Sequence, residues 1–200
     1  MTYPTHLAAV LAGGAGRRMG RPKADLRLGG RPLIEYPIAA MSEPTVEVVV
    51  VAKPDTPLPE LDARVWLEPP SPRHPLCGIV TALREGSQPL LVCGCDMPFV
   101  TPELAGWLGS FTDPLVVPYA GGRFHPLLAR YSPELLPALE EALAAERSLT
   151  AAVEELRPRR LAEDELRRFG DPERLLFNVN SPADLERAEE MLAKSAARSG

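Results

Sequence analysis

The segment Leu7–Lys23 has the sequence LAAVLAGGAGRRMGRPK. Its first part is short and apolar, which is typical of a buried strand. Its second part has glycine at positions 13, 14, 16 and 20, followed by a proline and a lysine. Clustered glycines interrupt regular structure. The segment therefore predicts a buried strand that runs directly into a glycine-rich loop.

Strands and helices are expected to alternate along the rest of the chain. Residues 46–52 are a continuous β-branched run, typical of a parallel strand covered on both faces. Further strands are expected at 65–67 and 89–95, with an antiparallel pair at 115–119 and 124–131. Helices are expected at 31–42, 76–85, 101–110, 133–145, 149–156 and 182–193, the third of them capped by Thr101. This order predicts an α/β fold, a three-layer α/β/α sandwich with a Rossmann-like, mostly parallel sheet and a small antiparallel insertion.

Composition limits the domain organisation and the class of partner. A chain of 200 residues with 45% hydrophobic content is expected to form one domain, over 1–194, with a disordered tail at 195–200. A net charge of -5 gives no basic surface for nucleic acid. No apolar run reaches the roughly 20 residues that span a bilayer. Three cysteines without C-x-x-C spacing indicate neither a disulfide framework nor a zinc site. We expect a cytoplasmic protein that contacts neither nucleic acid nor membrane.

The glycine-rich loop is suited to binding phosphate. Glycines let backbone N–H groups approach an anion closely, because no Cβ obstructs the contact. Arg17, Arg18 and Lys23 add positive charge around the same pocket. A Walker loop would need Ser or Thr after the lysine, where Ala24 stands, and a Rossmann loop would need glycine at Met19. The alternative is a basic surface turn with no ligand.

Lys23 weighs against that alternative. The chain contains only three lysines among its 22 basic residues, at positions 23, 53 and 194. Lysine is a compact and flexible point charge, unlike the planar fork of arginine. A lysine here indicates a site that needs an ammonium group to reach a phosphate.

Asp96 stands where the predicted strand at 89–95 ends. Ligands of open α/β sheets bind at the carboxyl ends of the strands. A carboxylate opposite a phosphate-binding loop is a suitable ligand for Mg²⁺. The alternative is a local cap, because Asp before a turn is common.

The segment Phe177–Leu185 contains both asparagines of the chain, Asn178 and Asn180. Residues at i and i+2 of an extended segment point to the same side, so both amides could face one ligand. Ser181 and Pro182 have a simpler explanation, as the cap and first residue of the last helix. Capping does not explain both asparagines.

These segments together resemble the molybdenum cofactor guanylyltransferases of the nucleotidyltransferase superfamily. The pattern of that family runs L-A-G-G-x-x-x-R-M-G-x-x-K, G-P-L-A-G, C-D-x-P, H-P and N-V-N-[ST]-P-x-[DE]-L. Its counterparts here are Leu11 to Lys23, His74 to Gly78, Cys95 to Pro98, His125 with Pro126, and Asn178 to Leu185. The resemblance covers nearly the whole chain.

The resemblance implies that GMP is transferred from GTP to the phosphate of molybdopterin, with Mg²⁺ as cofactor. It places Lys23, Arg18 and Asp96 in catalysis and Asp96 on the metal. Binding of the nucleotide or the acceptor is expected from Leu11, Ala12, Gly13, Gly14, Gly16, Lys23, Glu68, Asp96, Asn178 and Asn180. Asn178 and Asn180 are expected on the molybdopterin side. Molybdopterin-loading proteins and apo-molybdoenzymes are expected partners.

Three positions depart from the family pattern. Lys53 stands where the family commonly has Asn, His74 replaces the first glycine of G-P-L-A-G, and Glu68 is the nearest acid before that segment. Glu68 is either in the nucleotide site or a solvent-exposed loop carboxylate. His125 either belongs to the site or hydrogen-bonds within the sheet.

Two other functions remain open at this point. Cytidylyltransferases that act on molybdopterin or another phosphorylated acceptor usually have L-A-A-G, so Gly13 favours guanylyl transfer. From another class, the chain could be a non-catalytic nucleotide-binding carrier that delivers cofactor to molybdoenzymes. Lys23 and Asp96 argue against a silent protein.

Overall fold

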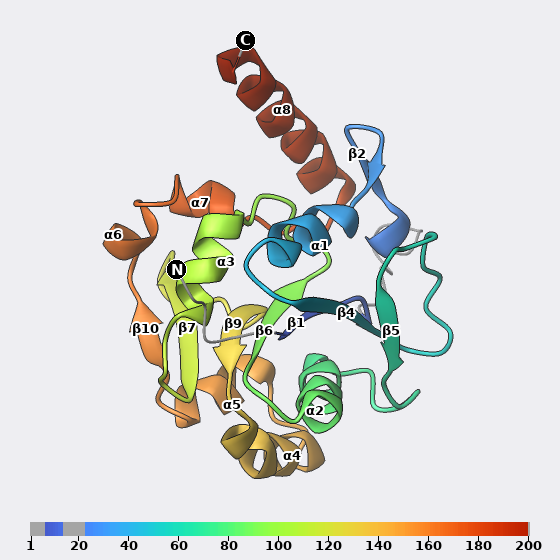
Figure 1. Ribbon diagram of the computed structural model, residues 1–200, viewed down its shortest axis with the longest axis vertical. Coiled ribbons are helices and arrows are strands. Elements are labelled where there is room, and N and C mark those ends of the chain that lie inside the picture. The colour runs from blue at the N-terminus through green and yellow to red at the C-terminus, as the bar shows by residue number, and fades with distance from the viewer. Residues whose placement is uncertain (1–6, 14–22, 200) are drawn as a thin grey trace.

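An eight-stranded sheet forms the centre of the molecule, shown in Figure 1. The computed structural model describes residues 7–13 and 23–199. The main strand order is β10-β7-β9-β6-β1-β4-β5, with β8 paired to β7. The strands are β1 (Leu7–Leu11), β4 (Glu47–Ala52), β5 (Arg64–Leu67), β6 (Leu90–Gly94), β7 (Leu115–Ala120), β8 (Arg123–Phe124), β9 (Leu128–Tyr131) and β10 (Arg159–Leu161).

Four neighbouring strands, β5, β4, β1 and β6, run parallel. Leu11 at the end of β1 lies opposite Val51 of β4 and Gly94 of β6. The carboxyl ends of these strands therefore meet at one edge of the sheet. β1 and β6 are buried along almost their whole length, as expected for strands with helices on both faces.

The part of the sheet beyond β6 has two strands more than expected. β9 lies between β6 and β7 and is antiparallel to both, while β10 runs parallel to β7. The expected strand at 124–131 is divided into β8 and β9 by a turn at residues 125–127, in which Leu128 N donates to His125 O at 3.0 Å. Pro126 has no N–H to donate to a ladder, which accounts for the break. The mostly parallel sheet with a small antiparallel insertion is confirmed.

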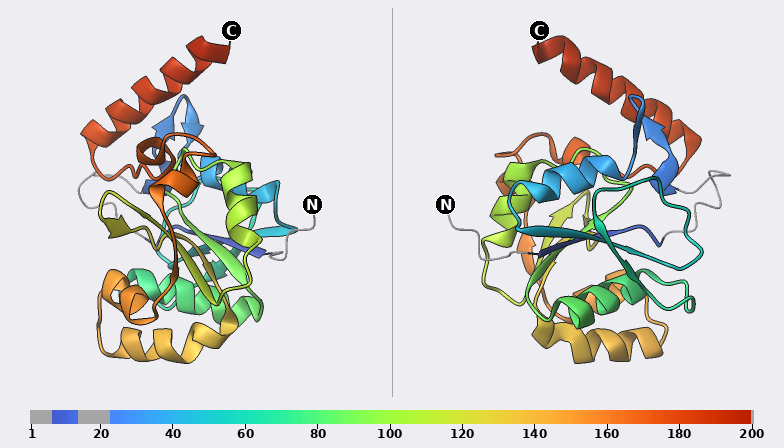
Figure 2. Two further views of the ribbon diagram at one scale, coloured as in Figure 1. Left: turned by 90° about the vertical axis from the view of Figure 1, so that its left-hand side faces the viewer. Right: turned by 45° about the vertical axis from the view of Figure 1, so that its right-hand side comes forward.

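Helices cover both faces of the sheet, as Figure 2 shows. One face of the sheet, which includes Leu7 and Ala9 of β1 and Val49 and Val51 of β4, packs with three helices, α2, α4 and α5. Ala8 of β1 points to the other face and packs with the helices α1 and α3. This follows from the alternation of side chains along a strand. The helices on the first face are α2 (Pro75–Gly86), α4 (Leu136–Ala144) and α5 (Leu149–Glu155), and those on the second face are α1 (Glu35–Ser42) and α3 (Pro102–Gly109).

Several element ends differ from expectation. The helix expected from residue 31 begins at Glu35, because β3 (Arg31–Pro32) pairs with β2 (Arg27–Leu28) in a small hairpin. The last helix, α8 (Pro182–Ser199), continues through residues expected to be disordered, since its end is rich in alanine, a strong helix former. Short elements missed from the sequence are β10, α6 (Glu163–Leu166), α7 (Pro172–Leu175) and two 3₁₀ turns, Lys23–Asp25 and Pro133–Leu135.

The expected cap at the start of α3 is confirmed. Thr101 Oγ1 accepts from Leu104 N at 3.3 Å, with Pro102 at the start of α3. Cys77, Cys93 and Cys95 are buried and free. Among the described helices, none is long and apolar enough to cross a bilayer.

Candidate active site

The carboxyl ends of the four parallel strands each carry a residue of the site. Gly13 follows β1, Lys53 follows β4, Glu68 follows β5, and Asp96 follows β6. Backbone bonds keep the strand ends in line, since Ala12 N donates to Val51 O at 2.8 Å and Glu68 N donates to Ala52 O at 2.9 Å. The parallel register alone thus gathers residues that lie more than eighty positions apart.

These strand ends contribute to the lining of a cavity of about 490 Å³, which we call the nucleotide cavity after the ligand expected there from the sequence. Its lining brings together most of the residues expected from the sequence. It is lined by Leu11, Gly13, Lys23, Val51, Glu68, Arg73, His74, Pro75, Gly78, Gly94, Cys95, Asp96, Leu127, Asn178 and Asn180.

Lys23 lies between two oxygen atoms from distant parts of the chain. Its Nζ donates to Asp96 Oδ2 at 2.7 Å and to Asn180 Oδ1 at 2.5 Å. The side chains of Lys23 and Asp96 are 16% and 11% exposed, so solvent screens this ion pair only in part. A carboxylate and an amide oxygen therefore converge on one positive charge at the mouth of the cavity.

The position of Asp96 is fixed by a tight turn after β6. Met97 N donates to Gly94 O at 3.2 Å, and a Cβ at Gly94 would lie 2.7 Å from Asp96 Oδ1. Glycine is thus required for this close approach. Val179 N donates to Asp96 O at 2.9 Å, which ties the C-terminal segment to the same turn.

Asn178 and Asn180 lie on the same side of their segment, as expected, with Val179 fully buried between them. Asn178 Nδ2 donates to Leu176 O at 2.8 Å, and Asn180 Oδ1 accepts from Lys23. The expected cap is also present, since Asp184 N donates to Ser181 Oγ at 3.2 Å. Capping and the placement of the two amides are therefore separate roles of one segment.

Glu68 is not a solvent-exposed carboxylate. It is 4% exposed and lies beside Gly13, where an added Cβ would be 2.1 Å from Glu68 Oε1. Lys53 Nζ lies 3.5 Å from the same oxygen. Burial raises the pKa of the Glu68 carboxyl, and the Lys53 ammonium opposes that shift. The Glu68 carboxyl thus lies in a poorly solvated place, and Lys53 has the largest influence among the groups that favour its charged form.

The remaining expected residues divide into two groups. The side chain of Ala12 is 2% exposed and packs in a core cluster with Ile34, so it does not line the cavity. Gly14, Gly16 and Arg18 lie outside the described residues.

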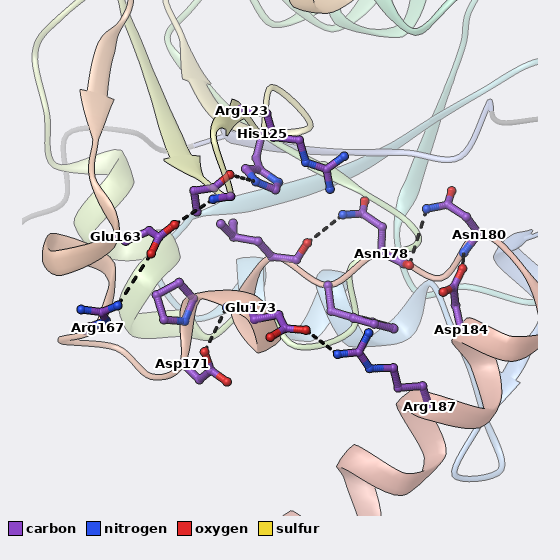
Figure 3. A pocket seen from close by; sticks show the side chains of 15 residues that line it. Arg123, His125, Glu163, Arg167, Asp171, Glu173, Asn178, Asn180, Asp184 and Arg187 are labelled. Atoms are coloured by element: carbon purple, nitrogen blue, oxygen red, sulfur yellow. Dashed lines mark hydrogen bonds and ion pairs between the residues drawn. The ribbon is translucent and has the colours of Figure 1, made fainter.

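A second cavity of about 670 Å³ adjoins the first through Asn178 and Asn180 (Figure 3). It lies between the β7–β8 hairpin and the segment from α6 to the start of α8, and we call it the acceptor cavity after the sequence expectation that Asn178 and Asn180 face the acceptor. Two of its arginines are paired, Arg167 with Glu163 at 3.7 Å and Arg187 with Glu173. Its lining is Ala120, Gly121, Arg123, His125, Glu163, Arg167, Asp171, Pro172, Glu173, Leu176, Phe177, Asn178, Asn180, Asp184 and Arg187.

His125 combines both of its expected roles. It lines the acceptor cavity, yet its Nε2 lies 3.2 Å from Ala120 O, so the ring is held by the hairpin backbone. Burial lowers the pKa of His125, which leaves the imidazole neutral at neutral pH. The ring is therefore a fixed neutral wall of the cavity.

Sequence reasoning did not assign Arg73 or His74 to the site, although both line the nucleotide cavity. His74 caps α2, with Nδ1 accepting from Leu76 N at 3.2 Å. The signal for that helix start was Pro75, which favours the first helical position. Arg123 and Arg187 of the acceptor cavity had no comparable local signal, because the fold alone brings their segments together.

Comparison with known proteins identifies the family to which the chain is similar. The MobA-like NTP transferase domain matches residues 8–161. A probable molybdenum cofactor guanylyltransferase of Pelotomaculum thermopropionicum is 35% identical over 190 residues, covering 93% of each chain. The molybdenum cofactor guanylyltransferase of Cereibacter sphaeroides is 35% identical and covers 94% of this chain and 97% of its own.

Solved structures show the same fold. Molybdopterin-guanine dinucleotide biosynthesis protein A from Archaeoglobus fulgidus superposes with a TM-score of 0.80 at 30% identity, over 94% of this chain and 99% of its own. A 2-C-methyl-D-erythritol 4-phosphate cytidylyltransferase from Thermus thermophilus, at 22% identity and a TM-score of 0.69, covers 94% of this chain and all of its own, and shares the fold alone. The chain belongs to the family of MobA-like NTP transferases, which includes the molybdenum cofactor guanylyltransferases.

Proposed function

We propose that this protein transfers GMP from GTP to the phosphate of molybdopterin, forming the guanine dinucleotide cofactor and pyrophosphate. The observation that carries this proposal is the convergence of Lys23, Asp96 and Asn180 where two cavities meet. A nucleotidyl transfer needs a donor and an acceptor on opposite sides of one phosphorus atom. Two adjoining cavities that share Asn178 and Asn180 fit this requirement.

The reaction needs no covalent intermediate on the protein. An oxygen of the acceptor phosphate attacks the α-phosphorus of GTP, and the bond to the bridging oxygen breaks, so pyrophosphate leaves with the electron pair. The acceptor phosphate is already ionised at neutral pH and needs no general base. The contribution of the protein is to orient the two substrates and to neutralise charge.

The residues present fit Mg²⁺. Asp96 Oδ2 and Asn180 Oδ1 already point at one cation, the Lys23 ammonium, and both are hard oxygen donors. The described residues contain no cluster of three or more His, Cys, Asp or Glu that could hold a metal. This donor set suits Mg²⁺, which proteins usually hold through one or two carboxylates together with substrate phosphates and water. Bound there, Mg²⁺ would neutralise negative charge on the triphosphate.

Lys23 is positioned to share that task. Its ammonium can move from Asp96 and Asn180 to a nearby phosphate, because lysine has a flexible stem and three donors. Asp96 would hold the metal, and Asn180 would orient the same region from the acceptor side. His125 is neutral and held by Ala120 O, so it forms part of the wall of the acceptor cavity.

Thermal unfolding with each nucleotide tests the proposal. A ligand that binds only the native state stabilises it by RT ln(1 + [L]/Kd). GTP with Mg²⁺ should therefore raise the Tm more than CTP, ATP or UTP at the same concentration. A larger shift with CTP would instead indicate cytidylyl transfer on the same fold. Nucleotide binding without pyrophosphate release in the presence of molybdopterin would identify a carrier.

A further inference from the structure

Charges of both signs line the acceptor cavity. Its three arginines stand against four carboxylates, so the lining as a whole is not positively charged. His125 adds no charge at neutral pH, because burial lowers its pKa. An anionic acceptor in a partly enclosed cavity needs a cation beside it. The charged residues of the lining are Arg123, Arg167, Arg187, Glu163, Asp171, Glu173 and Asp184.

Two of the three arginines are neutralised by carboxylates of the same cavity. Arg167 Nη2 lies 3.7 Å from Glu163 Oε2, and Arg187 pairs with Glu173. The other two carboxylates accept hydrogen bonds from backbone N–H groups near the starts of α7 and α8. The lining thus satisfies its own acidic groups without the third arginine.

Arg123 is that third arginine, and its charge is not neutralised. Its side chain has no ion pair and no hydrogen bond within the described residues. The titratable group that senses its charge is His125, whose pKa Arg123 lowers in addition to the larger effect of burial. A positive charge beside a neutral imidazole is therefore open to a ligand of the cavity.

The β7–β8 hairpin fixes the direction of Arg123. Gly121 and Gly122 have positive φ angles of 58° and 74°, which a two-residue turn of type I′ requires. Side chains alternate along the extended segment that follows this turn. Arg123 and His125 consequently line the acceptor cavity, whereas Phe124 packs against a core cluster.

The tip of this hairpin is held on two sides. Gly121 N donates to Glu163 Oε1 of α6 at 2.8 Å, and His125 Nε2 lies 3.2 Å from a carbonyl oxygen of β7. Figure 3 shows the guanidinium of Arg123 extending from the tip toward the side of the cavity where Asn178 lies. Asn178 also lines the nucleotide cavity. A braced piece of backbone therefore presents the cation toward the junction of the two cavities.

We propose that Arg123 binds the phosphate of the acceptor, an inference that rests on the proposed function. The planar guanidinium suits this task, because it can donate two parallel hydrogen bonds to a phosphate. Lys23 would neutralise the donor phosphates from the nucleotide cavity, and Arg123 the acceptor phosphate from the other side. Two anionic groups can then approach each other closely enough to react.

Equilibrium dialysis with molybdopterin and the full chain tests this proposal, because it measures acceptor binding without turnover. Arg123→Ala should raise the Kd for molybdopterin by about tenfold to a hundredfold, as expected for loss of hydrogen bonds to a charged group. The Tm and the affinity for GTP should stay unchanged, since the side chain has no bond to lose within the described protein. Arg123→Lys should recover part of the loss, because lysine keeps the charge but not the planar fork.

Molybdopterin from which the phosphate has been removed identifies the group that Arg123 contacts. If the guanidinium binds the phosphate, removing either partner deletes the same interaction, and the two losses should not add. Removal of the phosphate should therefore weaken binding to the wild type strongly and binding to Arg123→Ala much less. An equal loss of affinity in both proteins would mean that Arg123 does not contact the phosphate, and would overturn the inference.

Arg84→Ala is the matched control. Arg84 is an exposed arginine in the last turn of α2 that pairs with Glu140, and it does not belong to the described lining of either cavity. The control should bind GTP and molybdopterin as the wild type does. An unchanged affinity for molybdopterin in Arg123→Ala would overturn the inference and leave the proposed function standing. If the wild type binds neither GTP nor molybdopterin, the proposed function itself fails.

Discussion

Lys23 joins three parts of the chain that are distant in sequence. It belongs to the turn before β2, Asp96 follows β6, and Asn180 precedes α8. In the absence of substrate, the ammonium of Lys23 contacts two oxygen atoms. The same oxygen atoms are of the kind that can hold a metal ion, and the same ammonium is of the kind that can bind phosphate. If Asp96 holds the metal as proposed, activity should depend on its carboxylate more than on the stability of its ion pair with Lys23.

Asp96→Asn tests this dependence. An amide is a poorer ligand for a hard cation than a carboxylate, so pyrophosphate release should fall by on the order of a hundredfold or more. The Tm should change little, because the amide oxygen can still accept from Lys23. Asp62→Asn, at an exposed loop position, is the control and should keep full activity. Near-normal turnover of Asp96→Asn at physiological Mg²⁺ would remove Asp96 from the mechanism.

The sequence predicted part of the site for a clear physical reason. Gly13 and Asp96 directly follow strands whose buried, β-branched or apolar character is local, so their place at the sheet edge follows from the fold class. For Glu68 the sequence left two alternatives, a place in the nucleotide site or an exposed loop carboxylate, because its burial depends on Lys53 and on the loop up to Pro72. The contacts of Lys53 with Glu68 and with Pro72 leave no periodic hydrophobic pattern from which they could be predicted.

Helix ends were predictable where a side chain closes the first turn. Thr101 and Ser181 were both expected as caps, and both accept from the backbone N–H of the third residue of their helix. The short elements β2, β3 and β10 were missed. Each contains arginine or proline and is only two or three residues long, so partners elsewhere in the fold decide that it is a strand.

Thr101→Ala measures the value of such a cap. Loss of the bond to Leu104 N should lower the free energy of unfolding by about 1 kcal/mol. Thr150→Ala is the matched control, because Thr150 is exposed within α5 and alanine is the better helix former. Denaturant unfolding of both variants checks this. GTP affinity should be unchanged in each, and a Thr101→Ala variant as stable as the wild type would show that Pro102 alone suffices to start α3.

Apart from Asn178 and Asn180, which line both, the two cavities are formed by different elements of the molecule. The nucleotide cavity is built largely on the ends of β1, β4 and β6 and the start of α2, whereas the acceptor cavity depends on the β7–β8 hairpin and the segment from α6 to the start of α8. α8 packs against the β2–β3 hairpin and then projects beyond it (Figure 1). Gly29 N donates to Glu189 Oε1 at 2.8 Å, and Arg174 Nη1 donates to Met191 O at 2.8 Å. Docking of α8 thus holds the segment that carries Asn178 and Asn180.

Ala188→Asp should separate the two cavities functionally. Ala188 is fully buried between α8 and the hairpin, and a buried unpaired carboxylate should destabilise the docked helix by on the order of 2 kcal/mol or more. The nearby Asn178 and Asn180 would then lose their fixed positions. The KM for molybdopterin should rise several-fold, while GTP affinity should change little because Gly13 and Glu68 lie on other elements.

The matched control is Ala193→Asp, on the exposed side of the same helix, which should leave both substrates unaffected. Circular dichroism establishes whether each variant is folded at the assay temperature. If Ala188→Asp is unfolded, Leu185→Ala provides a milder disturbance of the same contact. Steady-state kinetics with each substrate varied in turn separate the two effects. If Ala188→Asp or Leu185→Ala weakens GTP binding while the KM for molybdopterin is unchanged, the C-terminal asparagines serve the nucleotide. The acceptor must then bind on the opposite side of Lys23.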